Sequence, residues 1–153
     1  MHGVCGLESN VWSHVLTTLT AWVSSGNAQY FGAINDPLNN TAIEMHQYLD
    51  SDSSGTSGTC VSSTVGAERL QVATDWLKSK GLQGYLGEMG AGSNSQCITA
   101  IQGALCTMQT SGVWIGFAWW AAGPWWGNVR VLFSLVWLMV SNSAYCLTVL
   151  HLN

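Results

Sequence analysis

The fold is decided by the stretch over residues 64–90, which reads TVGAERLQVATDWLKSKGLQGYLGEMG. In its first part, apolar residues recur at helical spacing from Leu70 to Leu77, Thr64 offers an N-cap, and two lysines precede Gly81. The second part, residues 83–88, is a short apolar-rich run that ends in Gly-Glu and is typical of a strand. The stretch therefore predicts a helix followed directly by a strand.

The same alternation continues on both sides of this stretch. Upstream, residues 41–46 predict a short strand, and residues 51–59 form a loop of small polar side chains. Downstream, residues 97–110 place apolar side chains on one helical stripe, and residues 113–120 have the β-branched and aromatic content of a strand. The order strand, helix, strand, helix, strand predicts an α/β fold built from parallel βαβ units with right-handed crossovers.

The two ends of the chain differ from this middle part. Residues 1–30 show no clean period and are left unassigned. In the tail, residues 131–140 are apolar except for Ser134, and no Asp, Glu, Lys or Arg follows Arg130. A membrane span needs about 20 apolar residues, and the polar residues 141–143 interrupt this run, so a membrane helix is not expected.

Composition narrows the class of protein. The 153 residues include 8 Asp and Glu against 4 Lys and Arg, a formal charge of −4, which argues against nucleic acid as a partner. Hydrophobic residues make up 48% of the chain and charged residues 8%, with 9 tryptophans, so intrinsic disorder is not expected. Low charge with many hydroxyl, amide and indole groups favours a secreted protein that handles a neutral, hydroxyl-rich ligand such as polysaccharide.

Cysteine spacing favours disulfides over a metal site. The five cysteines contain no C-x-x-C pair, so structural zinc is not expected. Cys60 lies in a polar loop and Cys97 begins a helical pattern, and both positions suit a bridge formed in an oxidising compartment. An odd number leaves at least one thiol unpaired, and no signal peptide is visible in the first ten residues.

Polar and aromatic residues stand at the ends of the three predicted strands. In a parallel barrel, functional groups lie at the carboxyl ends of the strands. His46 and Tyr48 end the first strand, Glu88 ends the second, and the Trp-Trp pair at 119–120 ends the third. The ordinary alternatives are a core histidine, a solvated loop carboxylate and tryptophans that only pack, yet all three ends carry groups suited to sugar chemistry.

The segment from about residue 22 to residue 128 resembles fungal endoglucanases of glycoside hydrolase family five. The motifs that carry the resemblance are AIEMHQYLDSD (42–52), GTC (58–60), GAERLQ (66–71), GYLGEMGAGSN (84–94) and WWAAGPWWG (119–127). The resemblance implies a partial (β/α)8 TIM barrel, roughly strands six to eight with their intervening helices. It also implies retaining hydrolysis of β-1,4-glucosidic bonds in cellulose or a related β-glucan, without metal or organic cofactor.

The resemblance implies a role for each strand-end residue. Glu88 resembles the nucleophile at the end of strand seven. Tyr48 and His46 resemble the strand-six pair, with Tyr48 placed to hydrogen-bond the nucleophile and His46 lining the cleft near the acid. Trp120 resembles the platform on which a glucose ring stacks. The family also bridges the cysteines that correspond to Cys60 and Cys97.

One half of the family's carboxylate pair has no counterpart. The family's acid/base glutamate follows an asparagine, and no Asn-Glu dipeptide occurs in this sequence. Glu44 lies two residues before His46, about 7 Å along the strand, so we expect it in an inner layer of the barrel and not as the acid. Three strands also cannot close a barrel. We therefore expect an endo-β-1,4-glucanase-type chain that is inactive alone.

The resulting organisation has three parts and leaves two alternatives open. Residues 1–21 form a divergent segment, 22–128 the barrel part, and 129–153 an apolar tail, which we hypothesise to be translated intron. The expected setting is extracellular, with polysaccharide as partner and no obligate protein partner. The alternatives are a non-catalytic carbohydrate-binding protein and a protein tethered to a membrane through residues 131–152.

Overall fold

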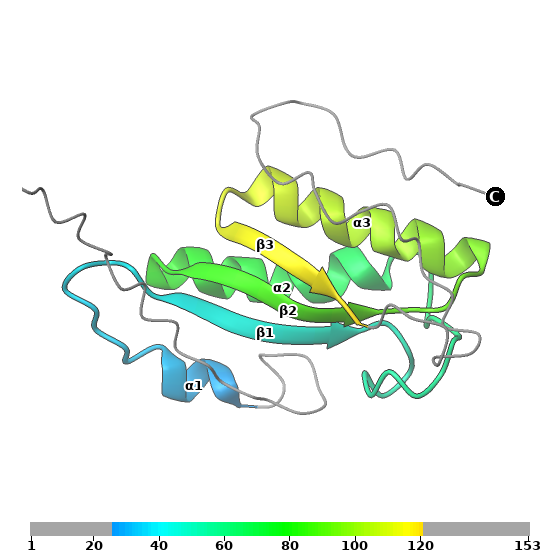
Figure 1. The fold of residues 1–153 in the computed structure, drawn as a ribbon, viewed down its shortest axis with the longest axis horizontal. Coiled ribbons are helices and arrows are strands. Elements are labelled where there is room, and N and C mark those ends of the chain that lie inside the picture. Colours follow the sequence, from blue (N-terminus) through cyan, green and yellow to red (C-terminus); the bar gives the residue numbers. More distant parts are fainter. Residues whose placement is uncertain (1–25, 121–153) are drawn as a thin grey trace, which may run out of the picture.

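The computed structural model describes residues 26–120, where three parallel strands alternate with helices (Figure 1). The elements in chain order are α1 (Asn27–Phe31), β1 (Ala42–Tyr48), α2 (Val65–Lys80), β2 (Gln83–Gly90), α3 (Ser95–Ser111) and β3 (Trp114–Trp119). The strands form one sheet in the order β1-β2-β3, and both neighbouring pairs are parallel. The predicted alternation from residue 41 onward, and with it the α/β class, is confirmed.

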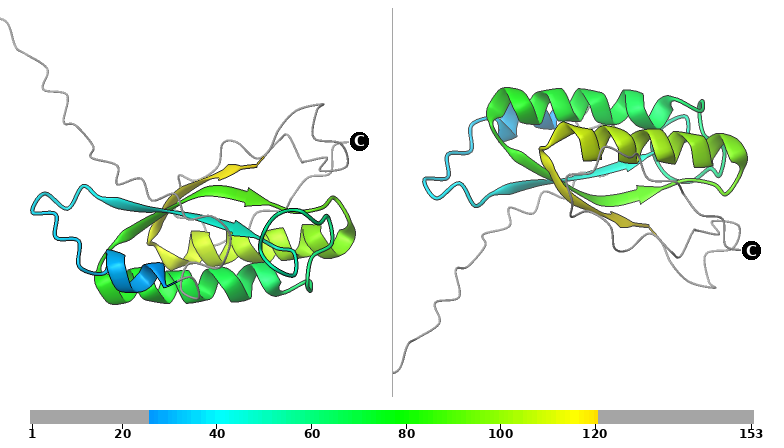
Figure 2. Two further views of the ribbon diagram at one scale, coloured as in Figure 1. Left: turned by 90° about the horizontal axis from the view of Figure 1, so that it is seen from below. Right: turned by 90° about the horizontal axis from the view of Figure 1, so that it is seen from above.

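Helices α2 and α3 cover one face of the sheet, as both views of Figure 2 show. The hydrophobic core lies between these helices and the sheet, and it joins side chains that are fully or almost fully buried. They include Ile43, Met45, Leu70, Leu77, Leu86, Met89, Ala100, Leu105 and Met108. Within residues 26–120, no helix covers the opposite face of the sheet, so polar side chains of the strands can lie there.

Helix α2 begins and ends where its sequence indicates, although its cap works differently. Thr64 occupies the N-cap position, but its hydroxyl donates to Glu68 Oε1 at 2.6 Å instead of accepting a backbone N–H. At the other end, Gly81 adopts a left-handed conformation with φ of 64°, and its N–H donates to the Lys78 carbonyl oxygen. The left-handed turn ends the helix and directs the chain into β2.

The other predicted boundaries need small corrections. Helix α3 starts at Ser95, two residues earlier than predicted, because the Asn94 side chain accepts from the Cys97 N–H and caps the helix. Strands β1 and β2 each continue two residues past their predicted ends, to Tyr48 and Gly90, whereas β3 is one residue shorter at each end. Short α1 lies in the segment that the sequence pattern left unassigned.

No helix among residues 26–120 is long and apolar enough to cross a membrane. The segment 131–152, on which the membrane alternative depends, lies outside the described residues, as do the divergent segment 1–21 and the tail 129–153.

Two glycines lie in the contact between α2 and α3, and they tolerate a side chain to different degrees. A Cβ at Gly66 of α2 would overlap the Ala100 carbonyl oxygen and come within 3.0 Å of the Ala104 Cβ. A Cβ at Gly103 of α3 would meet only Ala67, with its Cβ at 3.4 Å and its backbone nitrogen at 3.8 Å. The close approach of the two helices therefore requires glycine at residue 66 but not at residue 103.

We predict opposite effects of alanine at these two positions. Gly66→Ala should lower the free energy of unfolding by about 1–3 kcal/mol because the helices must separate. Gly103→Ala, the matched control, should raise it by up to about 1 kcal/mol because alanine favours the helix. Urea unfolding followed by circular dichroism measures both, and equal effects would contradict the packing described.

Candidate active site

The candidate site lies on the sheet face that points away from α2 and α3. Along β1, Met45 and its alternating neighbours are buried against the helices, while Glu44, His46 and Tyr48 are partly exposed on the other face. The three side chains share this face because successive residues of a strand point in opposite directions.

A β-bulge in β2 decides where Glu88 points. Met45 of β1 pairs with Leu86, but the next residue, His46, pairs with Glu88, so Gly87 is an extra residue in β2. Strict alternation from Leu86, which is completely buried under the helices, would place Glu88 on the helix side as well. The extra residue reverses the alternation and brings Glu88 to the open face beside His46.

The β3 side of the sheet shows the same bulge. Leu86 pairs with Phe117 and Met89 with Trp119, so β2 advances three residues while β3 advances two. Met89 is completely buried, like Leu86, although the two residues are an odd number of positions apart. Both side chains can be buried in the same core because the bulge reverses the alternation of β2, and the same reversal places Glu88 on the open face.

Glu88 is held by two side chains from β1. The Tyr48 hydroxyl donates to Glu88 Oε2 at 2.7 Å, and His46 Nδ1 lies 3.3 Å from the same oxygen. On the other side of the imidazole ring, His46 Nε2 lies 2.8 Å from Glu44 Oε1. The three residues predicted to work together, Glu88, His46 and Tyr48, are thus in contact, and Glu44 adds a second carboxylate that sequence reasoning assigned only to an inner layer.

The surroundings alter the acid–base properties of both Glu88 partners. The hydrogen bond to Glu44 and the charges of Glu44 and Glu88 raise the pKa of His46 above its ordinary value, against an opposing effect of burial. Burial, together with the hydrogen bond to Glu88, raises the pKa of Tyr48 far above its ordinary range. Tyr48 therefore stays a protonated donor to Glu88 throughout the physiological pH range.

Trp120 follows the last residue of β3 at the same edge of the sheet. Its backbone N–H donates to the Met89 carbonyl oxygen at 2.9 Å, and the residue is 45% exposed. A Cβ at Gly90 would come within 2.6 Å of the Trp120 carbonyl oxygen and 2.9 Å of Tyr48 Cε1. Glycine at residue 90 thus lets the end of β3 and the Tyr48 ring approach β2 together, whereas Trp119 packs against the core.

The loop after β1 supports Tyr48 through residues that the sequence reasoning missed. Asp50 is only 2% exposed, and its carboxylate accepts from the N–H groups of Gly55 and Ser57, both at 3.1 Å. Gly55, with φ of +75°, lies so close to the Tyr48 ring that a Cβ there would approach Cδ1 to 2.5 Å. Arg69 of α2 donates to the Tyr48 carbonyl oxygen at 2.6 Å. Only the small, polar side chains of residues 51–59 indicated a loop here.

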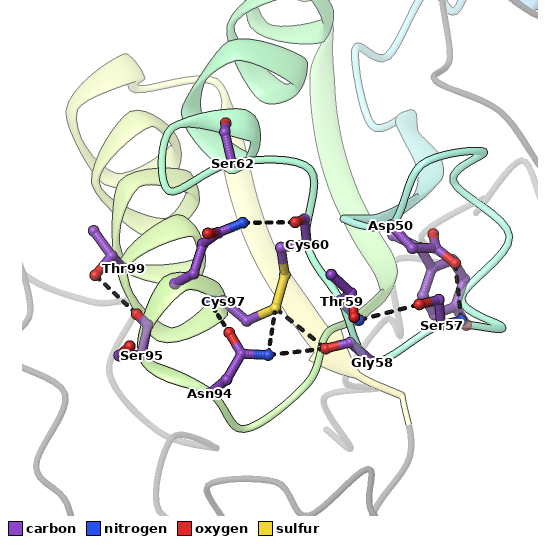
Figure 3. The surroundings of a disulfide bond; sticks show 12 residues. Asp50, Ser57, Gly58, Thr59, Cys60, Ser62, Asn94, Ser95, Cys97 and Thr99 are labelled. Carbon is purple, nitrogen blue, oxygen red and sulfur yellow. Dashed lines mark hydrogen bonds between the residues drawn. A yellow bond between two sulfur atoms is a disulfide. The ribbon is translucent and has the colours of Figure 1, made fainter.

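A disulfide joins the far end of this loop to α3. Cys60 and Cys97, the pair implied by the family resemblance, are bonded with their Cα atoms 5.4 Å apart (Figure 3). Beside the bond, the Gln96 amide donates to the Cys60 carbonyl oxygen at 2.7 Å, and the Asn94 amide donates to the Gly58 carbonyl oxygen at 3.0 Å. The first turn of α3 therefore fixes the end of the loop that packs over Tyr48.

The site is built around the carboxylate of Glu88. Among the residues that the structure describes, no group of three His, Cys, Asp or Glu side chains is placed to hold a metal ion. Glu88 is a partly exposed carboxylate with two side chains in contact with the same oxygen, and the exposed residue Trp120 follows β3 at the same edge of the sheet.

Comparison with protein families and curated proteins gives one consistent result. Residues 7–123 match the family model described as cellulase, glycosyl hydrolase family 5. A probable endo-β-1,4-glucanase B of Neosartorya fischeri is 50% identical over 123 residues, which are 80% of this chain and 36% of that protein. Endoglucanase 3 of Humicola insolens is 46% identical over 123 residues, again 80% of this chain and 30% of the relative.

Solved structures agree with this result. An endo-β-1,4-glucanase from Xanthomonas axonopodis pv. citri matches with a TM-score of 0.63 and 52% identity, over 67% of this chain and 33% of that chain. XacCel5A in complex with cellopentaose matches with a TM-score of 0.64 and 45% identity, over 69% and 36% of the two chains. The chain spans about a third of the length of these relatives, in keeping with the predicted part of a (β/α)8 barrel.

We predict that His46 makes stability depend on pH with a definite sign. Because its pKa is higher in the folded state, folding favours the protonated ring. The stabilisation is complete below the unfolded pKa, near 6.5, and is lost as pH rises through the folded pKa. The difference in unfolding free energy between the wild type and His46→Gln should therefore be larger at acid than at alkaline pH.

Urea unfolding of both proteins across this pH range measures that difference. The other three histidines are common to both chains, so their titration cancels in the comparison. A difference that stays constant with pH would contradict a raised pKa for His46.

Proposed function

We propose that this chain, which belongs to the cellulases of glycosyl hydrolase family 5, supplies the nucleophile side of an endo-β-1,4-glucanase site. The observation that carries the proposal is the pair of contacts on Glu88 Oε2: the Tyr48 hydroxyl donates to it at 2.7 Å, and His46 Nδ1 lies 3.3 Å from it. A carboxylate held in this way at the strand ends, at the same edge of the sheet as an exposed tryptophan, suits attack on a sugar.

The geometry supports a division of labour between the two oxygens of Glu88. Tyr48 and His46 both contact Oε2, which leaves Oε1 to form a bond with the anomeric carbon of the glucose unit. As that bond forms, the bond from the anomeric carbon to the leaving oxygen breaks, and a covalent glycosyl-enzyme results. Oε2 then becomes the carbonyl oxygen of the ester and can still accept from the Tyr48 hydroxyl. Water hydrolyses the ester with retained configuration.

Trp120 is proposed as the stacking platform for the glucan. The residue is 45% exposed, and it lies at the edge of the sheet where Tyr48 and Glu88 meet. The apolar C–H face of a glucose ring matches such a surface, and the related XacCel5A was solved with cellopentaose. The proposed substrate is therefore a β-1,4-linked glucan, and the disulfide Cys60–Cys97 supports an extracellular setting.

The proton donor is proposed to be absent from this chain. No Asn-Glu dipeptide occurs in its 153 residues, and Glu44 is engaged by His46 at 2.8 Å. Missing general acid catalysis slows cleavage of an ordinary glucoside by about 10²–10⁴-fold. We therefore propose that the chain alone does not turn over cellulose. We also propose that residues 22–128 are the barrel part and that residues 129–153 are translated intron.

We predict that Glu88 reacts with a substrate whose leaving group needs no proton. A suitable reagent is a dinitrophenyl β-cellobioside carrying fluorine on the second carbon of the reacting glucose, because dinitrophenolate departs unprotonated and the fluorine slows hydrolysis of the ester. The full chain should gain one fluorocellobiosyl group on the peptide that contains Glu88, as detected by mass spectrometry. Glu88→Gln should gain none.

Glu68→Gln is the matched control, since it removes an exposed carboxylate on α2 and should leave labelling intact. A label on another residue, or no label in the wild type, would contradict the nucleophile assignment. If the wild type hydrolyses carboxymethylcellulose and Glu88→Gln does not, the proposal that the chain lacks a proton donor is contradicted.

A non-catalytic carbohydrate-binding protein is the second candidate, and the exposure of Trp120 is the observation that favours it. Titration with cello-oligosaccharides separates the two candidates when it is combined with the labelling experiment. A binding protein should lose its affinity in Trp120→Ala, keep it in Glu88→Gln, and acquire no covalent label.

A further inference from the structure

The His46 imidazole lies between two carboxylates and contacts each through a different nitrogen. Nε2 is 2.8 Å from Glu44 Oε1, and Nδ1 is 3.3 Å from Glu88 Oε2. A neutral imidazole has one N–H and one lone pair, so one of its nitrogens would present a lone pair to an anionic oxygen. Only the imidazolium cation, with two N–H groups, can satisfy both contacts.

We propose that Glu44 is a positioning residue that holds His46 as an imidazolium cation with its Nδ1–H directed at Glu88. The role given to Glu88 rests on the proposed function, whereas the charge state of His46 does not. In the glycosyl-enzyme, Glu88 is an ester and no longer carries a charge. Glu44 is then the partner that keeps the ring charged and correctly turned through both steps of the reaction.

The backbone of β2 provides the space in which Glu44 sits. A Cβ at Gly87 would overlap Glu44 Oε1 and come within 2.7 Å of its Cδ. Because Gly87 is also the extra residue of the bulge, one glycine both turns Glu88 toward His46 and leaves room for the second carboxylate. Any side chain at residue 87 would displace Glu44 from the ring.

The other titratable groups near His46 do not replace Glu44. On this face, β1 also carries Tyr48, and β2 carries Tyr85, which pairs with Glu44, while the sequence of β3 contains no titratable residue. Tyr48 stays neutral, since its pKa is raised. On the loop and helix side, Asp50 is bonded to loop N–H groups and Arg69 to the Tyr48 carbonyl oxygen. Among residues 26–120, Glu44 and Glu88 are thus the carboxylates that contact the ring.

The direct test is an NMR titration of His46 in the full chain with nitrogen-15-labelled histidine, assigned by comparison with His46→Gln. In the wild type, the pKa of His46 should be higher than that of an unstructured histidine, and both ring nitrogens should be protonated at pH 6. Glu44→Gln should shift the His46 pKa downward because it removes an anion but keeps the size of the side chain. Glu68→Gln, which removes an exposed carboxylate on α2, is the matched control and should leave the His46 pKa unchanged.

Two further variants keep the test decisive if Glu44→Gln does not fold. Gly87→Ala should also shift the His46 pKa downward, although it removes no charge, because it crowds Glu44 away. Glu44→Asp should give an intermediate value, since the charge remains on a shorter side chain. An unshifted pKa in these variants, or a wild-type His46 that titrates like an unstructured histidine, would overturn the proposal. If Glu88 is not labelled but His46 titrates as predicted, the proposed function is contradicted and the role of Glu44 is not.

Discussion

The site depends on one constraint in β2, namely that Leu86 and Met89 both have to be buried beneath the helices although three positions separate them. A regular strand cannot meet this constraint, and the extra residue at Gly87 resolves it. The bulge rotates Glu88 onto the open face, where Tyr48 and His46 reach the same carboxylate oxygen. Core packing on one side of the sheet and a reactive group on the other are therefore consequences of the same backbone irregularity.

Support for the site is arranged in successive layers around Tyr48. Its hydroxyl contacts Glu88, its ring is covered by Gly55, and its carbonyl oxygen accepts from Arg69. Asp50 organises the loop that brings Gly55 into place by accepting backbone N–H groups, so a buried charge is satisfied within the chain. The disulfide ties the end of the loop to α3. Each layer restricts the next one, and Tyr48 has little freedom to leave the carboxylate.

Sequence patterns predicted the order of elements well because each helix and strand has its own period and its own end signals. The α2 segment, with its apolar spacing and Gly81, is the clearest case. The bulge could not be placed in the same way: a glycine inside a strand pattern indicates a bulge in general, but the register with β1 fixes which face Glu88 takes. The contact between Glu44 and His46 depends on how two side chains on the same face of β1 are oriented. The spacing along the strand gave no such information and assigned Glu44 to an inner layer. Asp50 and Arg69 were missed because their contacts are mainly with backbone groups, which leave no residue pattern to detect.

The sheet has the same order in space as in the chain, since each strand pairs with the one that precedes it. During synthesis on the ribosome, β2 therefore meets a strand that has already emerged, and β3 in turn meets the edge that β2 presents. Over residues 26–120, the chain can add one strand and helix at a time, and none of these three strands has to wait for a distant part of this range to be translated. A protein assembled in this way can acquire its structure progressively from the amino to the carboxyl end.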